Sequence, residues 1–248
     1  SEPEMTYADL GSEEYPQKFY MEYVPCNTGQ NWSPENFNTD MLPEWQDLLV
    51  ETNSTLVEAF GIGFEGEKPE GTEEDGYWQL LWNSKEDAEA GWETWEGYDK
   101  TADWAEANAD ILACGSKADT FSFDAYVRRS RDGLGTFDLT AFSSEYQFCA
   151  YNEGQGVDEL ISVIDDFEDW LVSDENSLDS PYTYVVLAPD YETEEFDLAW
   201  GNFHQSKEMR EAGLANFLDT APEIQEAFDK VLSCQEPNGF NSGQIPLI

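Results

Sequence analysis

The sequence predicts an α+β fold made of two tandem copies of one β-α-β-β-α-β unit. Three observations predict it. The four cysteines form two pairs with nearly equal separations, 88 residues between Cys26 and Cys114 and 85 between Cys149 and Cys234. Each early cysteine ends an aromatic run and is followed by a related turn, NTGQ or NEGQ. Strand-like and helix-like apolar periodicities then follow in the same order in both halves.

These landmarks set the expected organisation of the chain. An N-terminal extension at 1–14 precedes the first copy at 15–127. A linker at 128–135 leads to the second copy at 136–248.

The second copy shows its elements most clearly. Residues 136–151 alternate aromatic and polar side chains, which is typical of a strand. A helix with one apolar face is expected over 157–171, and strands over 180–189 and 194–203. Ser206 is expected to cap the next helix, and Thr220 to open the last one in a T-x-x-E capping box with Pro222 in its first turn. The tail 239–248 can supply a final strand.

The first copy follows the same order. A strand over 19–24 precedes a helix that carries Trp45, Leu48 and Leu49. Strands are expected over 55–64 and 77–82, and Ser84 is expected to cap the helix after them. A last helix over 101–112 and a strand over 119–129 complete the copy. This β-α-β-β-α-β order is the ferredoxin-like arrangement.

Residues 77–92 of the first copy also resemble residues 196–213 of the second. Trp82 lies 32 residues before Cys114, and Trp200 lies 34 before Cys234, so we match these two tryptophans. In this match His204, the only histidine of the chain, falls in a short insertion between Trp200 and a shared Ser-Lys-Glu helix start.

The repeat symmetry also favours one of the three ways to pair four cysteines, Cys26 with Cys114 and Cys149 with Cys234. The alternative is four free buried thiols in a cytosolic protein. The chain has no CxxC motif and no Cys/His cluster, so no zinc site is predicted. Disulfides would place the protein in an oxidising compartment.

The charge is extreme and spread along the chain. Asp and Glu number 54 against 11 Lys and Arg, which gives a formal net charge of −43. Such a surface repels nucleic acids and anionic membranes, so neither is an expected partner. It suits salty water, either outside a cell or inside a halophile. With the cysteines, we expect an extracellular or periplasmic protein. The opening SEPEMTYADL fits a mature chain after leader removal, or a trimmed one. No apolar run approaches the roughly 20 residues of a membrane helix.

A four-stranded antiparallel sheet with helices on one face leaves its other face in need of cover, and a second copy can provide it. In this order and duplication the sequence resembles the dimeric α/β-barrel superfamily, as a tandem single-chain version. The resemblance implies antiparallel sheets packed as a pseudo-dimeric α/β barrel. The superfamily includes small monooxygenases, haem-degrading enzymes and chlorite dismutase-like proteins, so fold alone does not imply a function.

His204 is the one candidate catalytic residue, because some enzymes of the superfamily use a histidine as haem ligand or acid/base. The matched stretch of the first copy has no histidine, and a loop position with an ordinary pKa is the favoured interpretation.

The candidate ligand-binding residues are aromatic or polar groups near strand ends. Core packing is the alternative for the aromatic members. They are Trp82, Trp200, Tyr23, Phe148 and Asn202.

Four charged or glycine-rich stretches are further candidate binding segments. RRSR at 128–131 could bind an anion or pair with neighbouring acids, and the second is favoured. The acidic stretches 165–169 and 173–180 lack EF-hand spacing and are expected to be solvated. Residues 61–71 are expected to connect a hairpin.

The sequence therefore favours a secreted, acidic, salt-adapted protein that binds a small neutral or cationic ligand or acts as a structural or interaction module. No cofactor or metal is predicted. The alternative is a monooxygenase-like or haem-handling enzyme with His204, Trp200 and Asn202 around one pocket. Whether the chain is an enzyme is left open.

Overall fold

The computed structural model describes residues 18–127, 137–178 and 180–247. The predicted extension 1–14, most of the predicted linker and the RRSR stretch lie outside these residues. The chain divides into two compact units. The N-terminal unit comprises Tyr20–Phe123 and the residues from Ser242 onward, and the C-terminal unit comprises Asp124–Asn241 with Lys18 and Phe19. The predicted second copy therefore includes residues 242–247, which belong to the N-terminal unit.

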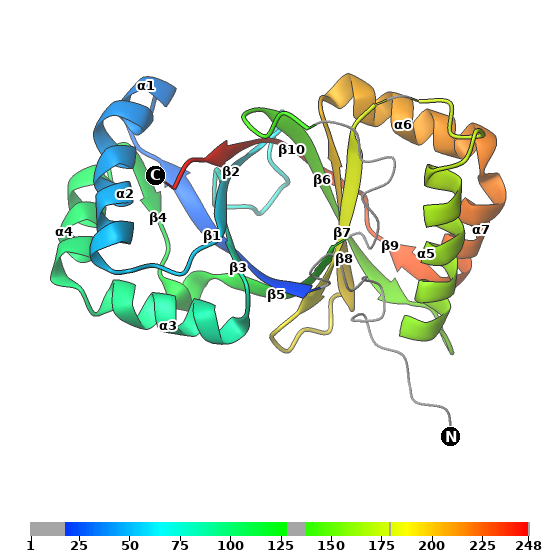
Figure 1. Ribbon diagram of the computed structural model, residues 1–248, viewed down its shortest axis with the longest axis horizontal. Coiled ribbons are helices and arrows are strands. Elements are labelled where there is room, and N and C mark those ends of the chain that lie inside the picture. Colours follow the sequence, from blue (N-terminus) through cyan, green and yellow to red (C-terminus); the bar gives the residue numbers. More distant parts are fainter. Residues whose placement is uncertain (1–17, 128–136, 179, 248) are drawn as a thin grey trace. The chain divides into compact units, whose positions relative to one another are not determined.

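The first half contains the four expected strands and, in addition, a short strand at 112–114 (Figure 1). Its strands are β1 (Lys18–Thr28), β2 (Glu58–Phe64), β3 (Gly76–Trp82), β4 (Leu112–Cys114) and β5 (Phe121–Val127). Its helical elements are α1 (Pro34–Asn36), the π-helical turn η2 (Phe37–Met41), α2 (Leu42–Glu51), α3 (Lys85–Glu96), α4 (Asp99–Asn108) and the short η3 (Lys117–Asp119).

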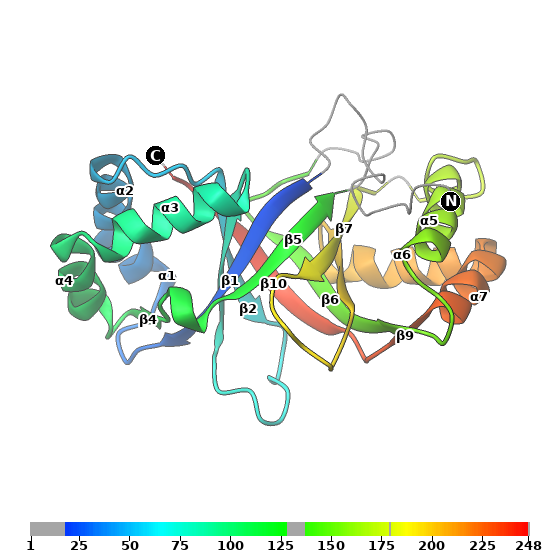
Figure 2. The same cartoon turned by 90° about the horizontal axis from the view of Figure 1, so that it is seen from below.

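The second half has the same order (Figure 2). Its strands are β6 (Phe142–Tyr151), β7 (Tyr182–Pro189), β8 (Leu198–His204), β9 (Leu232–Cys234) and β10 (Asn238–Ile245). Its helices are α5 (Val157–Leu171), α6 (Lys207–Thr220) and α7 (Pro222–Val231). The mixed α+β class is thus confirmed. No helix within the described ranges is both long and apolar enough to cross a membrane.

Strand order within each unit follows from the ladders. The N-terminal unit has the order β10-β2-β3-β1-β5, with the end of β10 beside β2, and its β1–β3 and β2–β3 pairs are antiparallel. In the C-terminal unit the order is β7-β8-β6, with β9 and the start of β10 beside β6. The glycine-rich stretch 61–71 lies in the β2–β3 hairpin, as expected, and Gly66 and Gly71 take positive φ there.

Each unit buries one face of its strands under its own helices. In the C-terminal unit α5, α6 and α7 cover this face, and Leu160, Ile164, Val186 and Leu198 are fully buried (Figure 1). In the N-terminal unit α2, α3 and α4 cover it, and the core is rich in indoles, among them Trp45, Trp78 and Trp82. Two separate cores follow from this arrangement.

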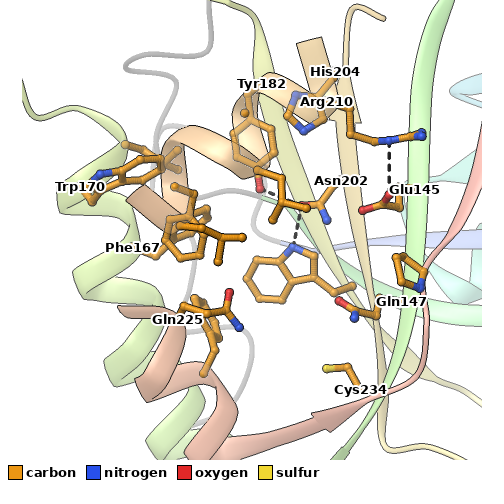
Figure 3. Close-up of a pocket in the computed structure, with 18 of the residues that line it drawn as sticks. Glu145, Gln147, Phe167, Trp170, Tyr182, Asn202, His204, Arg210, Gln225 and Cys234 are labelled. Carbon is orange, nitrogen blue, oxygen red and sulfur yellow. Dashed lines mark hydrogen bonds and ion pairs between the residues drawn. The ribbon is translucent and has the colours of Figure 1, made fainter. Parts of the chain in front are cut away.

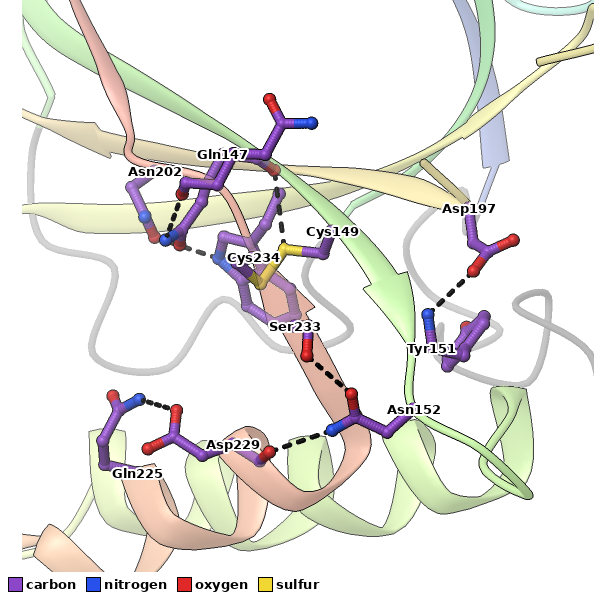
Figure 4. Close-up of a disulfide and its surroundings, with 12 residues drawn as sticks. Gln147, Cys149, Tyr151, Asn152, Asp197, Asn202, Gln225, Asp229, Ser233 and Cys234 are labelled. Atoms are coloured by element: carbon purple, nitrogen blue, oxygen red, sulfur yellow. Dashed lines mark hydrogen bonds between the residues drawn. A yellow bond between two sulfur atoms is a disulfide. The ribbon is translucent and has the colours of Figure 1, made fainter. Parts of the chain in front are cut away.

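The disulfides are the predicted ones, Cys26–Cys114 and Cys149–Cys234. Each joins the first strand of its half to the short strand after the last helix, and the paired cysteines are ladder partners. Polar contacts surround the second bridge (Figure 4): Asn152 Nδ2 donates to the carbonyls at the end of α7, and Ser233 Oγ donates to Asn152 Oδ1. Cys114 and Cys234 are the last residues of the short strands β4 and β9, which follow the last helix of each half.

The helix caps were predicted with one error. Ser84 Oγ accepts from Asp87 N, and Ser206 Oγ accepts from Met209 N, as expected. The capping box at Thr220 is wrong, because Thr220 still belongs to α6 and its hydroxyl donates to Asn216 O. Pro222 does open α7, without a side-chain cap.

Candidate functional site

The residue pairing between β1 and β3, and between β6 and β8, allows the two halves to be matched residue by residue. Cys26 pairs with Gly76 and Cys149 pairs with Leu198, so positions can be counted from the same point in both. Trp78 then matches Trp200, and Trp82 matches His204. The stretches YWQLLWNSKE and AWGNFHQSKE align without a gap.

This register corrects two sequence inferences. Trp82 and Trp200 are not equivalent, and His204 is not in an insertion. His204 is the last residue of β8 and replaces an indole of the other half. The sequence match failed because it was anchored on a shared tryptophan, whereas hydrogen-bonded register fixes equivalence in a sheet.

A cavity of about 610 Å³ lies in the C-terminal unit between its strands and helices. Trp200, Asn202 and His204 all line it, because alternate residues of β8 face the helices. Glu145 and Gln147 of β6 line the same wall (Figure 3), and Cys149 of the same strand is also among the lining residues. Phe167 and Trp170 of α5, with Leu214 and Phe217 of α6, form the apolar side.

His204 is a buried, neutral imidazole in this wall. The residue is 7% exposed, and its ring lies 4.8 Å from the Tyr182 ring and against Gly213 of α6. Burial, together with the nearby Arg210 guanidinium, lowers the pKa of His204 to about 4. Its Nδ1 has no hydrogen-bond partner among the described residues. The expected surface-loop position with an ordinary pKa is therefore wrong.

Asn202 is the polar centre of the site. Its Oδ1 accepts from Tyr182 Oη at 2.8 Å and from Trp200 Nε1 at 3.0 Å (Figure 3). Two donors on one oxygen fix which way the amide points, so the Nδ2 donors face elsewhere. The amide can then offer hydrogen bonds to a guest.

Charge in the cavity wall is mostly negative. Glu145, Asp229 and Glu236 line it together with one arginine. Arg210 Nε lies 3.3 Å from Glu145 Oε2, and Arg210 Nη1 donates to Ser143 Oγ at 2.7 Å. The arginine is thus already paired, and the site favours neutral or cationic guests over anions. Within the described ranges, no three His, Cys, Asp or Glu side chains gather as a metal-binding group.

In the N-terminal unit, side chains occupy most of the equivalent space between strands and helices. Its cavity measures about 180 Å³. The buried Glu22, which matches Glu145, accepts from Trp82 Nε1 at 2.9 Å and from Trp92 Nε1 at 2.6 Å, and pairs with Lys117. In the C-terminal unit His204 and Leu214 occupy the positions of these two indoles. The cavity without these two indoles is the larger one, and Arg210 pairs with Glu145 there as Lys117 pairs with Glu22.

The remaining predicted site residues lie elsewhere. Tyr23 is buried on the other face of β1, against Tyr77 and Phe123. Phe148 packs on Phe196 at 4.7 Å. Neither lines either of these two cavities, because strand alternation turns both away from the helices. Trp82 lines the smaller cavity. Glu145, Arg210 and the α6 side chains were missed, since no sequence pattern ties them to β8 before the register is known.

Comparisons with known proteins show similarity of fold. No family model matches the chain, and no curated protein matches its sequence. A solved structure of chlorite dismutase from Candidatus Nitrospira defluvii superposes with a TM-score of 0.55 at 8% identity, over 94% of each chain. A Fusobacterium nucleatum protein assigned as a monooxygenase gives a TM-score of 0.54 at 9% identity, again over 94% of each chain.

Proposed function

We propose that this chain, whose fold is that of the dimeric α/β-barrel superfamily, binds a small neutral or cationic molecule in the cavity of its C-terminal unit. One observation carries the proposal: His204 and Leu214 stand where the other half has indoles, and the cavity is about 610 Å³ instead of about 180 Å³. Ligand sites are commonly apolar cavities of this size with a few convergent polar groups.

The apolar residues and the polar residues of the cavity wall would have different roles in binding. A flat apolar body would lie against Phe167, Trp170 and Trp200, whose rings supply contact area at low entropic cost. The Asn202 amide and the neutral His204 imidazole would orient it through hydrogen bonds. The three carboxylates of the wall would reject anions.

The proposal includes tandem duplication of one unit and an extracellular or periplasmic location. The gapless match at the third strands supports duplication. Two disulfides are typical of oxidising compartments, and the net charge of −43 suits a salty medium.

A dye titration of the full chain tests the proposal. The neutral probe 6-propionyl-2-dimethylaminonaphthalene (prodan) should bind with a blue-shifted emission, whereas the anionic 1-anilinonaphthalene-8-sulfonate should not. The variant His204→Trp/Leu214→Trp restores both indoles and should weaken prodan binding more than about ten-fold, since the guest volume is refilled. Met209→Trp adds an indole to α6 at a residue outside the cavity lining and serves as the matched control. Equal prodan affinity in all three proteins would refute the proposal.

A monooxygenase-like enzyme is the second candidate, because His204, Trp200 and Asn202 do line one cavity. Two features weigh against it. A histidine with a pKa near 4 is a weak base at neutral pH, where a useful general base has a pKa near the operating pH. A neutral imidazole suits haem iron, but the cavity wall carries three carboxylates and one paired arginine, which does not fit the two propionates of haem.

Titration with haemin decides this candidate. A Soret shift in the wild-type protein that His204→Ala abolishes would establish haem ligation by His204. We expect neither a shift nor a difference between the two proteins.

A further inference from the structure

The second cavity, in the N-terminal unit, contains a buried donor without an acceptor. Trp78 is 5% exposed, and its Nε1 has no hydrogen-bond partner among residues 18–127, 137–178 and 180–247. Trp78 lines the cavity of about 180 Å³ under α2, α3 and α4. A buried indole N–H normally finds a partner, and leaving it unpaired is costly.

Comparison of the halves explains the missing acceptor. The matching indole, Trp200, donates to Asn202 Oδ1 at 3.0 Å. Asn202 corresponds to Leu80, which has no acceptor. The N-terminal unit therefore has the donor without a side-chain acceptor at the matched position.

The cavity wall defines what could replace that partner. Indoles dominate the wall, with Trp45, Trp82, Trp92, Trp95 and Trp104 beside Trp78, and no charged residue is among its described lining residues. An ion would therefore enter without compensation. The carboxylate of Glu22, which accepts from two of the lining indoles, also pairs with Lys117 and accepts from the Ser122 hydroxyl.

Size sets a further limit. An apolar cavity of about 150 Å³ is large enough to bind benzene, and this one is of similar volume.

We propose that this cavity is a second binding site, for a small, neutral, mainly apolar molecule with one hydrogen-bond acceptor, such as an aromatic ketone, which receives the Trp78 N–H. The site is independent of the cavity in the C-terminal unit. It differs in requiring an acceptor on the guest and in excluding both signs of charge.

Acetophenone and cumene test this site, because they have nearly the same shape but only acetophenone has a carbonyl. In the ¹⁵N-labelled full chain, acetophenone should bind about ten-fold more tightly than cumene and move the Trp78 indole proton downfield, as expected when a buried unpaired donor gains an acceptor. Trp78→Phe identifies the resonance and should abolish the preference. Leu80→Asn, which restores the acceptor found in the other half, should abolish it too.

Trp200→Phe is the control in the other cavity and should leave the acetophenone preference unchanged. Equal affinity for the two probes, or a downfield shift confined to the Trp200 resonance, would overturn the proposal. These results are separate from the prodan experiment, which reports on the C-terminal unit.

Discussion

The wall of the larger cavity holds His204 in an environment that opposes its protonation. It is shielded by Tyr182 and Gly213, and Arg210 lies close by. A neutral imidazole there can accept or donate a hydrogen bond but holds no charge at physiological pH. Its role in binding is therefore one of orientation.

The depressed pKa makes stability depend on pH in a defined window. The unfolded chain takes up the proton near pH 6.5 and the folded chain only near pH 4. Stability due to neutral His204 is thus complete above pH 6.5 and is lost as the pH falls toward 4. Between pH 7 and pH 4.5, the wild-type protein should lose about 2 kcal/mol more unfolding free energy than His204→Gln, because each pKa unit is worth about 1.4 kcal/mol.

Urea denaturation of both proteins at the two pH values measures this difference. Carboxylate titration is common to both and cancels. Because the chain has one histidine, no other imidazole contributes. Parallel pH profiles for the two proteins would mean that the imidazole is not desolvated.

Sequence patterns singled out His204, Trp200 and Asn202, and the structure places all three in one cavity. The same patterns could not show that His204 replaces an indole. Spacing alone could not identify the partner of Trp200, because Trp78 and Trp82 lie 36 and 32 residues before Cys114, each two away from the 34 residues between Trp200 and Cys234. Equivalence within a strand depends on hydrogen-bonded pairing, which side-chain identity does not encode.

At the scale of elements, helices α3 and α6 approach their strands at matched glycines. A Cβ on Gly91 would lie 2.6 Å from the Trp82 ring, and a Cβ on Gly213 would lie 3.0 Å from His204 Cε1. The Trp82 indole is held by its bond to Glu22, whereas His204 borders the larger cavity. The two glycines thus occupy equivalent positions, but the side chain that faces Gly213 has room to move and the one that faces Gly91 does not.

Replacing each glycine with alanine should separate these effects. Alanine gains about 1 kcal/mol of helix propensity at either site. At Gly91 overpacking costs about 1–3 kcal/mol, so Gly91→Ala should be destabilising. Gly213→Ala should stay within about 1 kcal/mol of wild type, because His204 can shift toward the cavity. Chemical denaturation measures both, and equal effects would show that the cavity gives His204 no freedom.

Elements were largely predictable because their signals are local. Apolar periodicity identified α5 over its full length, and two serines marked the starts of α3 and α6. The T-x-x-E pattern at Thr220 failed because α6 continues through Thr220 and α7 starts two residues later. A local motif cannot show whether the preceding helix has already ended.

At the scale of the whole molecule, the surface charge dominates. With a formal net charge of −43, self-repulsion opposes the compact state wherever it is not screened. The described ion pairs are few beside 54 acidic residues, and most are at least partly exposed. Exposed pairs of this kind contribute about 0–1 kcal/mol each, so they do not offset the imbalance.

The melting temperature should therefore rise when salt is added from about 0.01 M to about 0.1 M, since the Debye length falls from about 30 Å to about 10 Å. Differential scanning calorimetry at fixed pH measures it. Sodium and potassium chloride should act alike if screening is the cause. A flat response, or a rise with one cation alone, would contradict this account of the charge.

The two disulfides give the chain a covalent connectivity of two separate rings. One ring closes from residue 26 to residue 114 and the other from 149 to 234, and no bridge crosses between them. During synthesis the chain emerges with its N-terminus first, so both cysteines of the first ring are present before Cys149 appears. The first ring can therefore oxidise without a competing thiol, and the second is then left with one possible partner for each cysteine. When the first ring oxidises before Cys149 appears, chain order therefore favours the observed one of the three connectivities.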